Sequence, residues 1–217
     1  MCGRFTATQD RFQLTTSLSC APPLEWKPRF NIAPSQRILV LRASTEGRRE
    51  FALPSWGIPP TRLRMGNTHP LINVRAESLQ ERASLGAAFL RRRCIVIADG
   101  FYEWLRRASI KSPAIPVYFK FTRPLGLAGI WEPGDGEGKP GPESCSVITV
   151  SANELVSQVH DRMPALLVAE NFNRWLDPFA EKHELRELLT VPPASLLRAF
   201  ESTPAVNNTK NDGPELL

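Results

Sequence analysis

Residues 94–104 read Cys-Ile-Val-Ile-Ala-Asp-Gly-Phe-Tyr-Glu-Trp, and this stretch decides the fold class. The run Cys94–Ala98 is apolar and rich in β-branched residues, which is typical of a buried strand. Asp99-Gly100 is a tight-turn dipeptide, so we expect Phe101–Trp104 to be the strand that returns. Two strands joined by a turn, with no helix between them, favour antiparallel pairing.

The pattern on either side of this stretch mixes strands and helices without the regular alternation of a parallel sheet. Strands are expected at Gly3–Thr6, Arg37–Arg42, Phe51–Trp56, Val117–Phe121, Leu127–Trp131 and Cys145–Val150, with a hairpin at Glu46-Gly47. Helices are expected at Thr8–Leu18 and at about 76–90, 153–158, 171–177 and 181–190, and residues 195–201 fit either type. This order predicts an α+β fold with a mainly antiparallel, barrel-like sheet.

The chain has 217 residues and shows neither a repeat nor a clean linker. We therefore expect a single domain over residues 1–217. The Gly-, Pro- and acid-rich stretch near 132–144 is the predicted flexible loop. No apolar run approaches the roughly 20 residues of a membrane helix, and no export signal is recognisable. The sequence thus predicts a cytoplasmic protein without membrane attachment, and a monomer.

Cys2, Cys20, Cys94 and Cys145 are the four cysteines, and they are widely spaced. They form no Cys-x-x-Cys pair and no cluster with histidine, which argues against a zinc site or a disulfide framework. We therefore expect reduced thiols, no metal and no cofactor.

Positive charge is concentrated in the first half of the chain. Between Lys27 and Lys111 there are 16 Lys and Arg residues against 6 Asp and Glu, most of the basic ones arginine. The planar arginine fork suits phosphate groups, so this bias indicates a polyanion partner. A solvated basic face is the simpler interpretation of the same charges.

Cys2 follows the initiator methionine directly. Removal of Met1 would leave a free α-amine and a thiol on adjacent carbons, a 1,2-aminothiol. The amine can condense with an aldehyde to a Schiff base, and the thiolate can then close a thiazolidine ring. The ordinary pKa values are about 8 for the amine and about 8.5 for the thiol, so both are partly nucleophilic near neutral pH. The simpler interpretation is a small apolar residue that begins a strand.

Three other side chains are candidates for chemistry. Glu103 lies among aromatic residues, where partial desolvation would raise its pKa toward acid–base use. His160 lies in a polar turn beside Asp161 and Arg162, and Asn73 lies near a helix start. Each also has a plain interpretation: a solvent-facing glutamate, a surface histidine and a helix cap.

Taken together, the motifs resemble the SRAP family (SOS-response-associated peptidase, abasic-site processing proteins). The resemblance rests on seven stretches that run in order along nearly the whole chain: residues 1–5 (MCGRF), 31–34 (NIAP), 56–57 (WG), 72–77 (INVRAE), 92–104, 128–132 (AGIWE) and 160–164 (HDRMP). One departure is Val74, where alanine is expected.

The resemblance implies a pseudo-barrel α+β fold that binds single-stranded DNA and crosslinks to abasic sites. It places the catalytic residues at Cys2, Asn73, Glu103 and His160, and DNA contacts at Arg4, Trp56, Arg75 and Arg162. In this hypothesis Glu103 assists sugar ring opening, and Cys2 forms a thiazolidine with the exposed aldehyde. His160 stabilises or protonates the leaving oxygen, Asn73 orients Cys2 or the sugar, and Trp56 stacks a base. The protein would then be nucleoid-associated when bound to DNA.

Two other functions use the same residues. An N-terminal-nucleophile peptidase or hydrolase, including autoprocessing, would employ the same Cys2, and a lyase would cleave the strand from the Schiff-base stage. A non-catalytic module for single-stranded DNA would need only the basic half and the aromatic residues.

Overall fold

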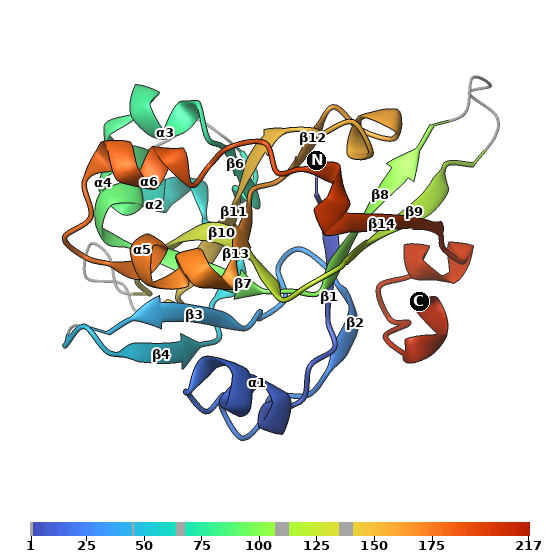
Figure 1. The fold of residues 1–217 in the computed structure, drawn as a ribbon, viewed down its shortest axis with the longest axis horizontal. Helices are drawn as coiled ribbons and strands as arrows, with labels where there is room; N and C mark the ends of the chain where they lie inside the picture. The colour runs from blue at the N-terminus through green and yellow to red at the C-terminus, as the bar shows by residue number, and fades with distance from the viewer. Residues whose placement is uncertain (1, 45, 64–67, 107–112, 135–140) are drawn as a thin grey trace.

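A computed structural model describes residues 2–217 except residues 45, 64–67, 107–112 and 135–140 (Figure 1). Within these residues the fold is α+β with mostly antiparallel strands, as the sequence predicts. The strands form two open sheets rather than a closed barrel. Met1 lies outside the described residues, and so does the centre of the flexible loop predicted near 132–144.

The smaller sheet has five strands in the order β14-β9-β8-β1-β2, all paired antiparallel. These are β14 (Leu197–Glu201), β9 (Ile115–Phe121), β8 (Gly100–Leu105), β1 (Arg4–Ala7) and β2 (Arg29–Ile32). The first strand of the chain is therefore central to this sheet and pairs with β8 on one side. That pairing carries the N-terminal residues to the middle of the molecule.

The larger sheet has nine strands, and its main path runs β12-β11-β10-β7-β3-β4. These are β12 (Arg162–Pro164), β11 (Ser144–Ser151), β10 (Leu125–Glu132), β7 (Arg93–Ile97), β3 (Val40–Ala43) and β4 (Arg49–Ala52). Off this path, β13 (Leu166–Val168) pairs with β10, while β5 (Ser55–Trp56) and β6 (Asn73–Arg75) pair with β11. The β5 and β6 pairings are parallel. The hairpin predicted at Glu46-Gly47 is confirmed by the β3–β4 pairing.

The turn at Asp99-Gly100 is a corner between the two sheets, so the hairpin predicted there is wrong. Strand β7 pairs with β3 and β10, whereas β8 pairs with β1 and β9. Thr6 and Thr8 of the first strand region bond to the Asp99 carboxylate, which ties the corner to β1. Gly100 is required because a Cβ there would meet the Tyr118 ring at 2.4 Å.

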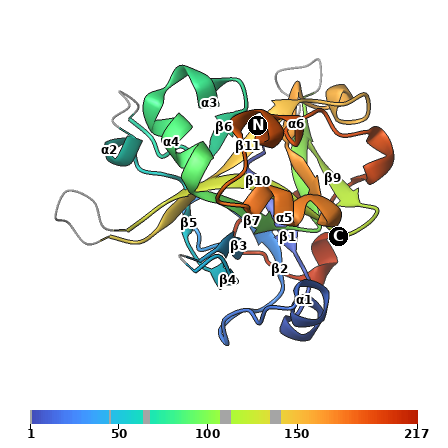
Figure 2. The ribbon, with the colours of Figure 1, turned by 60° about the vertical axis from the view of Figure 1, so that its left-hand side comes forward.

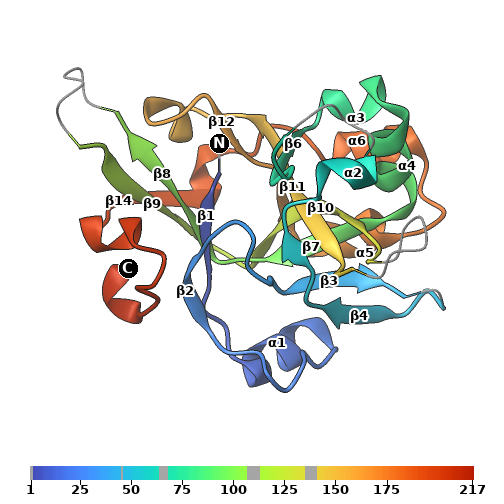
Figure 3. The ribbon, with the colours of Figure 1, turned by 180° about the vertical axis from the view of Figure 1, so that it is seen from behind.

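The helices are short and peripheral. They are α1 (Arg11–Leu18), α2 (Pro60–Leu63), α3 (Ser78–Glu81), α4 (Ala83–Arg91), α5 (Phe172–Leu176) and α6 (Lys182–Glu187). Helices α2 to α6 gather at one end of the molecule and α1 stands apart, as the front and back views show (Figures 1 and 3). In the described part of the chain, no helix is long and apolar enough to span a membrane.

Two helix predictions need correction. The helix expected from Thr8 begins later: Asp10 caps α1 through a capping box with Gln13, while Thr8 is bonded to Asp99. The helix expected at 76–90 is split in two by extended backbone at Arg82. Residues 195–201, which fitted either type, form a short 3₁₀ turn (Ala194–Leu196) followed by β14.

The core has one large cluster that includes both sheets, with Phe101 and Phe119 stacked at 5.0 Å between ring centroids, and a smaller cluster around Tyr102 and Tyr118. The C-terminal segment packs beside β2 (Figure 2). The buried Asn31 amide donates to the carbonyl oxygens of Val206, Asn208 and Asn211. This clamp brings residues near both ends of the chain together.

Candidate active site

Cys2 is fully buried and lies just before β1. The side-chain amide Nδ2 of Asn73, the first residue of β6, donates a hydrogen bond to the Cys2 carbonyl oxygen across 2.7 Å. Asn73 is only 6% exposed, and its Oδ1 is buried without a hydrogen-bond partner among the described residues. A buried amide acceptor that is left open is unusual in a folded protein.

Glu103 approaches Cys2 from the neighbouring strand. The antiparallel register pairs Arg4 with Tyr102, so Glu103 lies one position beyond that pair, level with the residues before β1. Glu103 is 3% exposed, and burial raises the pKa of its carboxyl while the charge of His160 acts against that rise. The sequence expected partial desolvation, and the side chain is in fact almost completely buried.

The Cys2 thiol is not poised for reaction in this conformation. Burial raises the pKa of the Cys2 thiol, and the negative charge of Glu103 raises it further. The expectation of a partly ionised thiol near neutral pH concerns the chain without Met1 and stays a prediction. A thiol in this state reacts only after a neighbouring base takes its proton or after water gains access.

His160 joins this group from the segment between the 3₁₀ turn Val156–Gln158 and β12. Its Nδ1 accepts the backbone N–H of Arg162 at 2.9 Å and lies 2.9 Å from Oδ1 of Asp161. The electrostatic influence of His160 on Glu103 places the two side chains close together. Cys2, Asn73, Glu103 and His160 thus converge from four separate segments, and their catalytic roles stay predictions.

Arg4 is half-buried, and its guanidinium is bound by groups of the protein. Its Nη1 donates to Asn31 Oδ1 at 2.7 Å and to the Val206 carbonyl at 2.6 Å. Its guanidinium also lies over the Trp104 ring, 5.6 Å from the centroid. Burial lowers the pKa of Arg4. In this conformation Arg4 ties β1 to the C-terminal segment.

Trp56 is completely buried, so the prediction that it stacks on a base is wrong for this conformation. Its indole N–H donates to the Ile72 carbonyl at 2.8 Å, and its ring meets the Phe5 ring edge-on at 5.0 Å. Gly57 follows with φ +128, and a Cβ there would lie 3.0 Å from Pro70. The Trp56 ring therefore packs against β1, and its hydrogen bond holds Ile72, the residue before β6.

Arg75 is exposed and lines a cavity of about 250 Å³ beside Asn73. The cavity is also lined by Leu71, Val74, Ser78, Arg82 and Leu85. The exposed Arg82 on this cavity was not singled out from the sequence, because nothing in its local pattern distinguishes it from other basic residues. Two arginines therefore give this cavity positive charge beside a candidate catalytic amide.

The guanidinium of Arg162 is bound by a carboxylate of the protein itself. Its Nη1 and Nη2 meet the two oxygens of Glu77 at 2.9 and 3.0 Å, and Nη2 also donates to the Thr149 carbonyl at 2.7 Å. The Arg162 side chain is only 11% exposed, whereas that of Glu77 is 57% exposed. The sequence placed Glu77 in a motif but gave it no partner, because the two residues are 85 positions apart.

Several arginines of the basic half hold the fold together. Arg42 pairs with Glu50 and Glu143 and lies over the Trp131 ring. The buried Arg93 donates to the carbonyls of Phe89, Trp175 and Asp177. The charge count alone therefore overstates the number of arginines available to a polyanion. Among the described residues, no cluster of His, Cys, Asp and Glu is arranged to hold a metal ion.

Comparison with known proteins agrees with the architecture. The family model described as SOS response associated peptidase (SRAP) matches residues 1–209. The chain is 34% identical to the abasic site processing protein YoqW of Bacillus subtilis over 223 residues, which span 100% of this chain and 99% of YoqW. It is 33% identical to the abasic site processing protein HMCES of Gallus gallus over 75% of this chain and 55% of that protein.

The fold also matches known structures. A crystal structure of a protein from Bacteroides thetaiotaomicron superposes with a TM-score of 0.84 at 21% identity, covering 99% of this chain and 98% of the other. At that identity the likeness concerns the fold alone. Because the family model spans nearly the whole chain, this protein belongs to the SRAP family.

Proposed function

We propose that this protein binds single-stranded DNA that contains an abasic site and forms a covalent crosslink to it through Cys2. The observation that carries the proposal is the convergence of Cys2 with Asn73, Glu103 and His160 in one buried site. The names of YoqW and HMCES, which describe abasic site processing, support the same substrate class. The reactive form is the chain from which Met1 has been removed.

The proposed reaction begins with the closed abasic sugar. Glu103 removes the proton of the C1′ hydroxyl while a proton is delivered to the ring oxygen, and the ring opens to an aldehyde. The Cys2 α-amine adds to C1′, and loss of one water gives a Schiff base. The Cys2 sulfur then adds to the same carbon while its proton passes to the nitrogen, which closes the thiazolidine. The sum is one bond from C1′ to nitrogen, one to sulfur and one released water.

Burial gives Glu103 the property that this role needs. A raised pKa brings a carboxyl closer to neutral pH, which favours its use as a general acid and base. It also lies close enough to Cys2 to influence the thiol, so it can take the proton that burial holds on the sulfur. His160, whose charge acts on Glu103, supplies a second proton donor for the leaving oxygen.

Asn73 contributes orientation rather than proton transfer. Its Nδ2 fixes the Cys2 carbonyl, which limits rotation of the residue that carries both nucleophiles. Its buried Oδ1 can accept a further hydrogen bond, and either the Cys2 amine or a sugar hydroxyl could donate it. Asn73 can thereby hold the two reactants against one another.

The experiment incubates purified protein with an oligonucleotide that has one abasic site, and with its intact and duplex counterparts. Intact mass first establishes that Met1 is absent. A denaturation-stable adduct on the abasic single strand alone is the expected result. No adduct with correctly processed protein rejects the proposal. Equal affinity for intact and abasic strands without an adduct would indicate a simple binding module, and release of a peptide fragment would indicate a hydrolase.

A further inference from the structure

Glu77 stands at the junction between two parts of the candidate site. It lies two residues beyond β6, the strand whose first residue is Asn73. Its carboxylate grips Arg162, the first residue of β12. Both strands pair with β11, β6 in parallel and β12 antiparallel. Glu77 therefore links the segment that holds Cys2 to the segment that carries His160.

The link between Glu77 and Arg162 is geometrically specific. Two nearly equal contacts, 2.9 and 3.0 Å, join the two arginine nitrogens to the two carboxylate oxygens. This two-armed arrangement fixes orientation as well as distance. The Thr149 carbonyl takes a further hydrogen bond at 2.7 Å, so the guanidinium is fixed from β11 as well. The Arg162 contact also lowers the pKa of the Glu77 carboxyl, which keeps it ionised.

The same arginine controls the His160 ring through its backbone. The Arg162 N–H donates to His160 Nδ1 at 2.9 Å. The Asp161 carboxylate lies 2.9 Å from the same nitrogen, so Nδ1 is held between two groups. Moving the Arg162 backbone would therefore change where the ring points.

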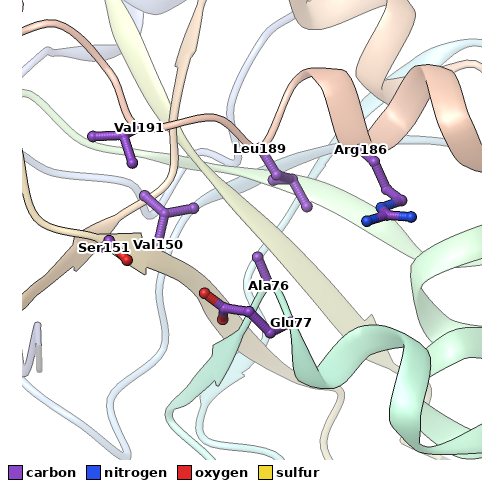
Figure 4. Close-up of a pocket in the computed structure, with 7 residues that line it drawn as sticks. All are labelled: Ala76, Glu77, Val150, Ser151, Arg186, Leu189 and Val191. Carbon is purple, nitrogen blue, oxygen red and sulfur yellow. The ribbon is translucent and has the colours of Figure 1, made fainter.

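The surroundings of Glu77 do not by themselves explain why its carboxylate pairs with Arg162. Figure 4 shows the Glu77 carboxylate beside a cavity of about 220 Å³, with Arg186 on the opposite wall. Glu77 nonetheless pairs with Arg162. Because the Glu77 side of the pair is exposed to solvent, the pair contributes little to stability. Its specific geometry between two active-site segments fits a role in positioning.

We propose that Glu77 is a positioning residue that, through Arg162, sets the orientation of the His160 ring for the crosslinking reaction. The proposal rests on the crosslinking function proposed above. It differs from a role for Arg162 in gripping phosphate, because here the fork is occupied by the protein's own carboxylate.

The test compares Glu77→Gln with wild type in single-turnover crosslinking over a series of DNA concentrations and pH values. Glu81→Gln, an exposed glutamate in the same region, is the charge-matched control. The expected result is a rate constant at saturating DNA reduced about tenfold in Glu77→Gln, less than the loss of an acid–base group itself. The rate constant of Glu77→Asp should be within about threefold of the wild-type value. The rate constant of Glu81→Gln should equal that of wild type.

The pH dependence of the crosslinking rate distinguishes a positioning role from a purely structural one, because loss of stability alone would not change it. His160 is surrounded by Asp161 at Nδ1, by Glu103 from β8 and by the Arg162 backbone. The pH dependence of the saturating rate should shift in Glu77→Gln and stay unchanged in Glu81→Gln. Unchanged rate and profile, with tighter DNA binding only, would overturn the proposal and assign Glu77 to competition with phosphate.

A spectroscopic arm separates this inference from the proposed function. The chain has three histidines, and a His160→Gln variant assigns the His160 imidazole signals by nuclear magnetic resonance. The expected result is a change in the His160 ring nitrogen signals in Glu77→Gln without DNA. An unchanged His160 signal rejects the inference, even when wild type forms the adduct. A changed signal in a protein that forms no adduct rejects the crosslinking function and keeps the structural coupling.

Discussion

The amide of Asn73 and the carbonyl of Cys2 are joined by a 2.7 Å hydrogen bond between residues 71 positions apart. The bond aligns the start of the chain with β6, which itself runs parallel to β11. The N-terminal residue that carries the proposed chemistry is thus fixed from the side as well as by its own strand. Changes in Asn73 should affect both stability and reaction rate.

Asn73→Ala removes the donor and leaves the buried Cys2 carbonyl without it. The expected cost is about 2 kcal/mol, which lowers the melting temperature by roughly 4–8 °C for a chain of this size. Crosslinking at saturating DNA should slow by at least about tenfold because Cys2 gains rotational freedom. Calorimetry and adduct formation on denaturing gels measure the two effects. The exposed Asn173→Ala is the control, and a wild-type rate in Asn73→Ala would refute the orienting role.

Glu103→Gln should reveal the cost of burying a carboxylate. Burial raises the folded-state pKa of Glu103, so the group is stabilising in its protonated form and loses that contribution as pH rises through the folded pKa. The variant should therefore gain stability relative to wild type between the ordinary glutamate pKa, about 4.3, and neutral pH. Melting temperatures across that range test the sign, and a difference that does not change with pH contradicts it. Crosslinking should fall by about 10²–10⁴-fold.

Cys2→Ser separates the amine from the sulfur. The amine still forms the Schiff base, so strand cleavage by elimination should continue and borohydride should trap the adduct. The stable thiazolidine should be absent, since the hydroxyl is a far weaker nucleophile than the thiolate. Gels with and without reductant distinguish the two products. A heat-stable adduct from Cys2→Ser without reductant would show that sulfur is not required.

Arg93 and Arg82 should respond in opposite ways to replacement by alanine. Arg93 is buried on three backbone carbonyls, and burial lowers its pKa to about 10, still well above neutral pH. Its loss should cost about 3 kcal/mol and leave the salt dependence of DNA binding unchanged. Arg82→Ala should keep the melting temperature but reduce the salt slope by about one. The reverse pattern would show that exposure does not identify the phosphate contacts.

Trp56→Phe tests the corrected role of the buried tryptophan. The ring keeps most of its packing against Phe5 but loses the hydrogen bond to the Ile72 carbonyl. A loss of about 1 kcal/mol is expected, with unchanged affinity for intact single-stranded DNA. If affinity falls while the melting temperature stays constant, the ring reaches bases after all and the site must open on binding.

The fold class and the set of candidate catalytic residues could be predicted because they depend on local patterns and ordered motifs. Asp99-Gly100 shows the limit of that approach. The dipeptide correctly marks a sharp change of direction, but only tertiary packing decides that β8 joins β1 rather than β7. Trp56 shows the same limit, since its burial depends on Phe5 and Ile72.

The sequence also does not predict contacts between residues that are far apart in the chain. The pairing of Glu77 with Arg162 and the clamp from Asn31 to the C-terminal carbonyls join residues 85 or more positions apart. No local pattern encodes which of many acidic side chains a given arginine will meet. The burial of Cys2 cannot be predicted from the sequence for a related reason, because it depends on β6 and β8 together.

The hydrogen bond from Arg4 to the Val206 carbonyl has a consequence for the timing of maturation. Its two residues are 202 positions apart, so the first strand cannot reach its final packing until nearly the whole chain has been synthesised. At about 5–20 residues per second, that leaves the nascent amino terminus open for roughly 10–40 s. Cys2 is fully enclosed once folding is complete. An aminopeptidase that acts on the start of this chain therefore has its best access during translation, and late processing would require the finished protein to open.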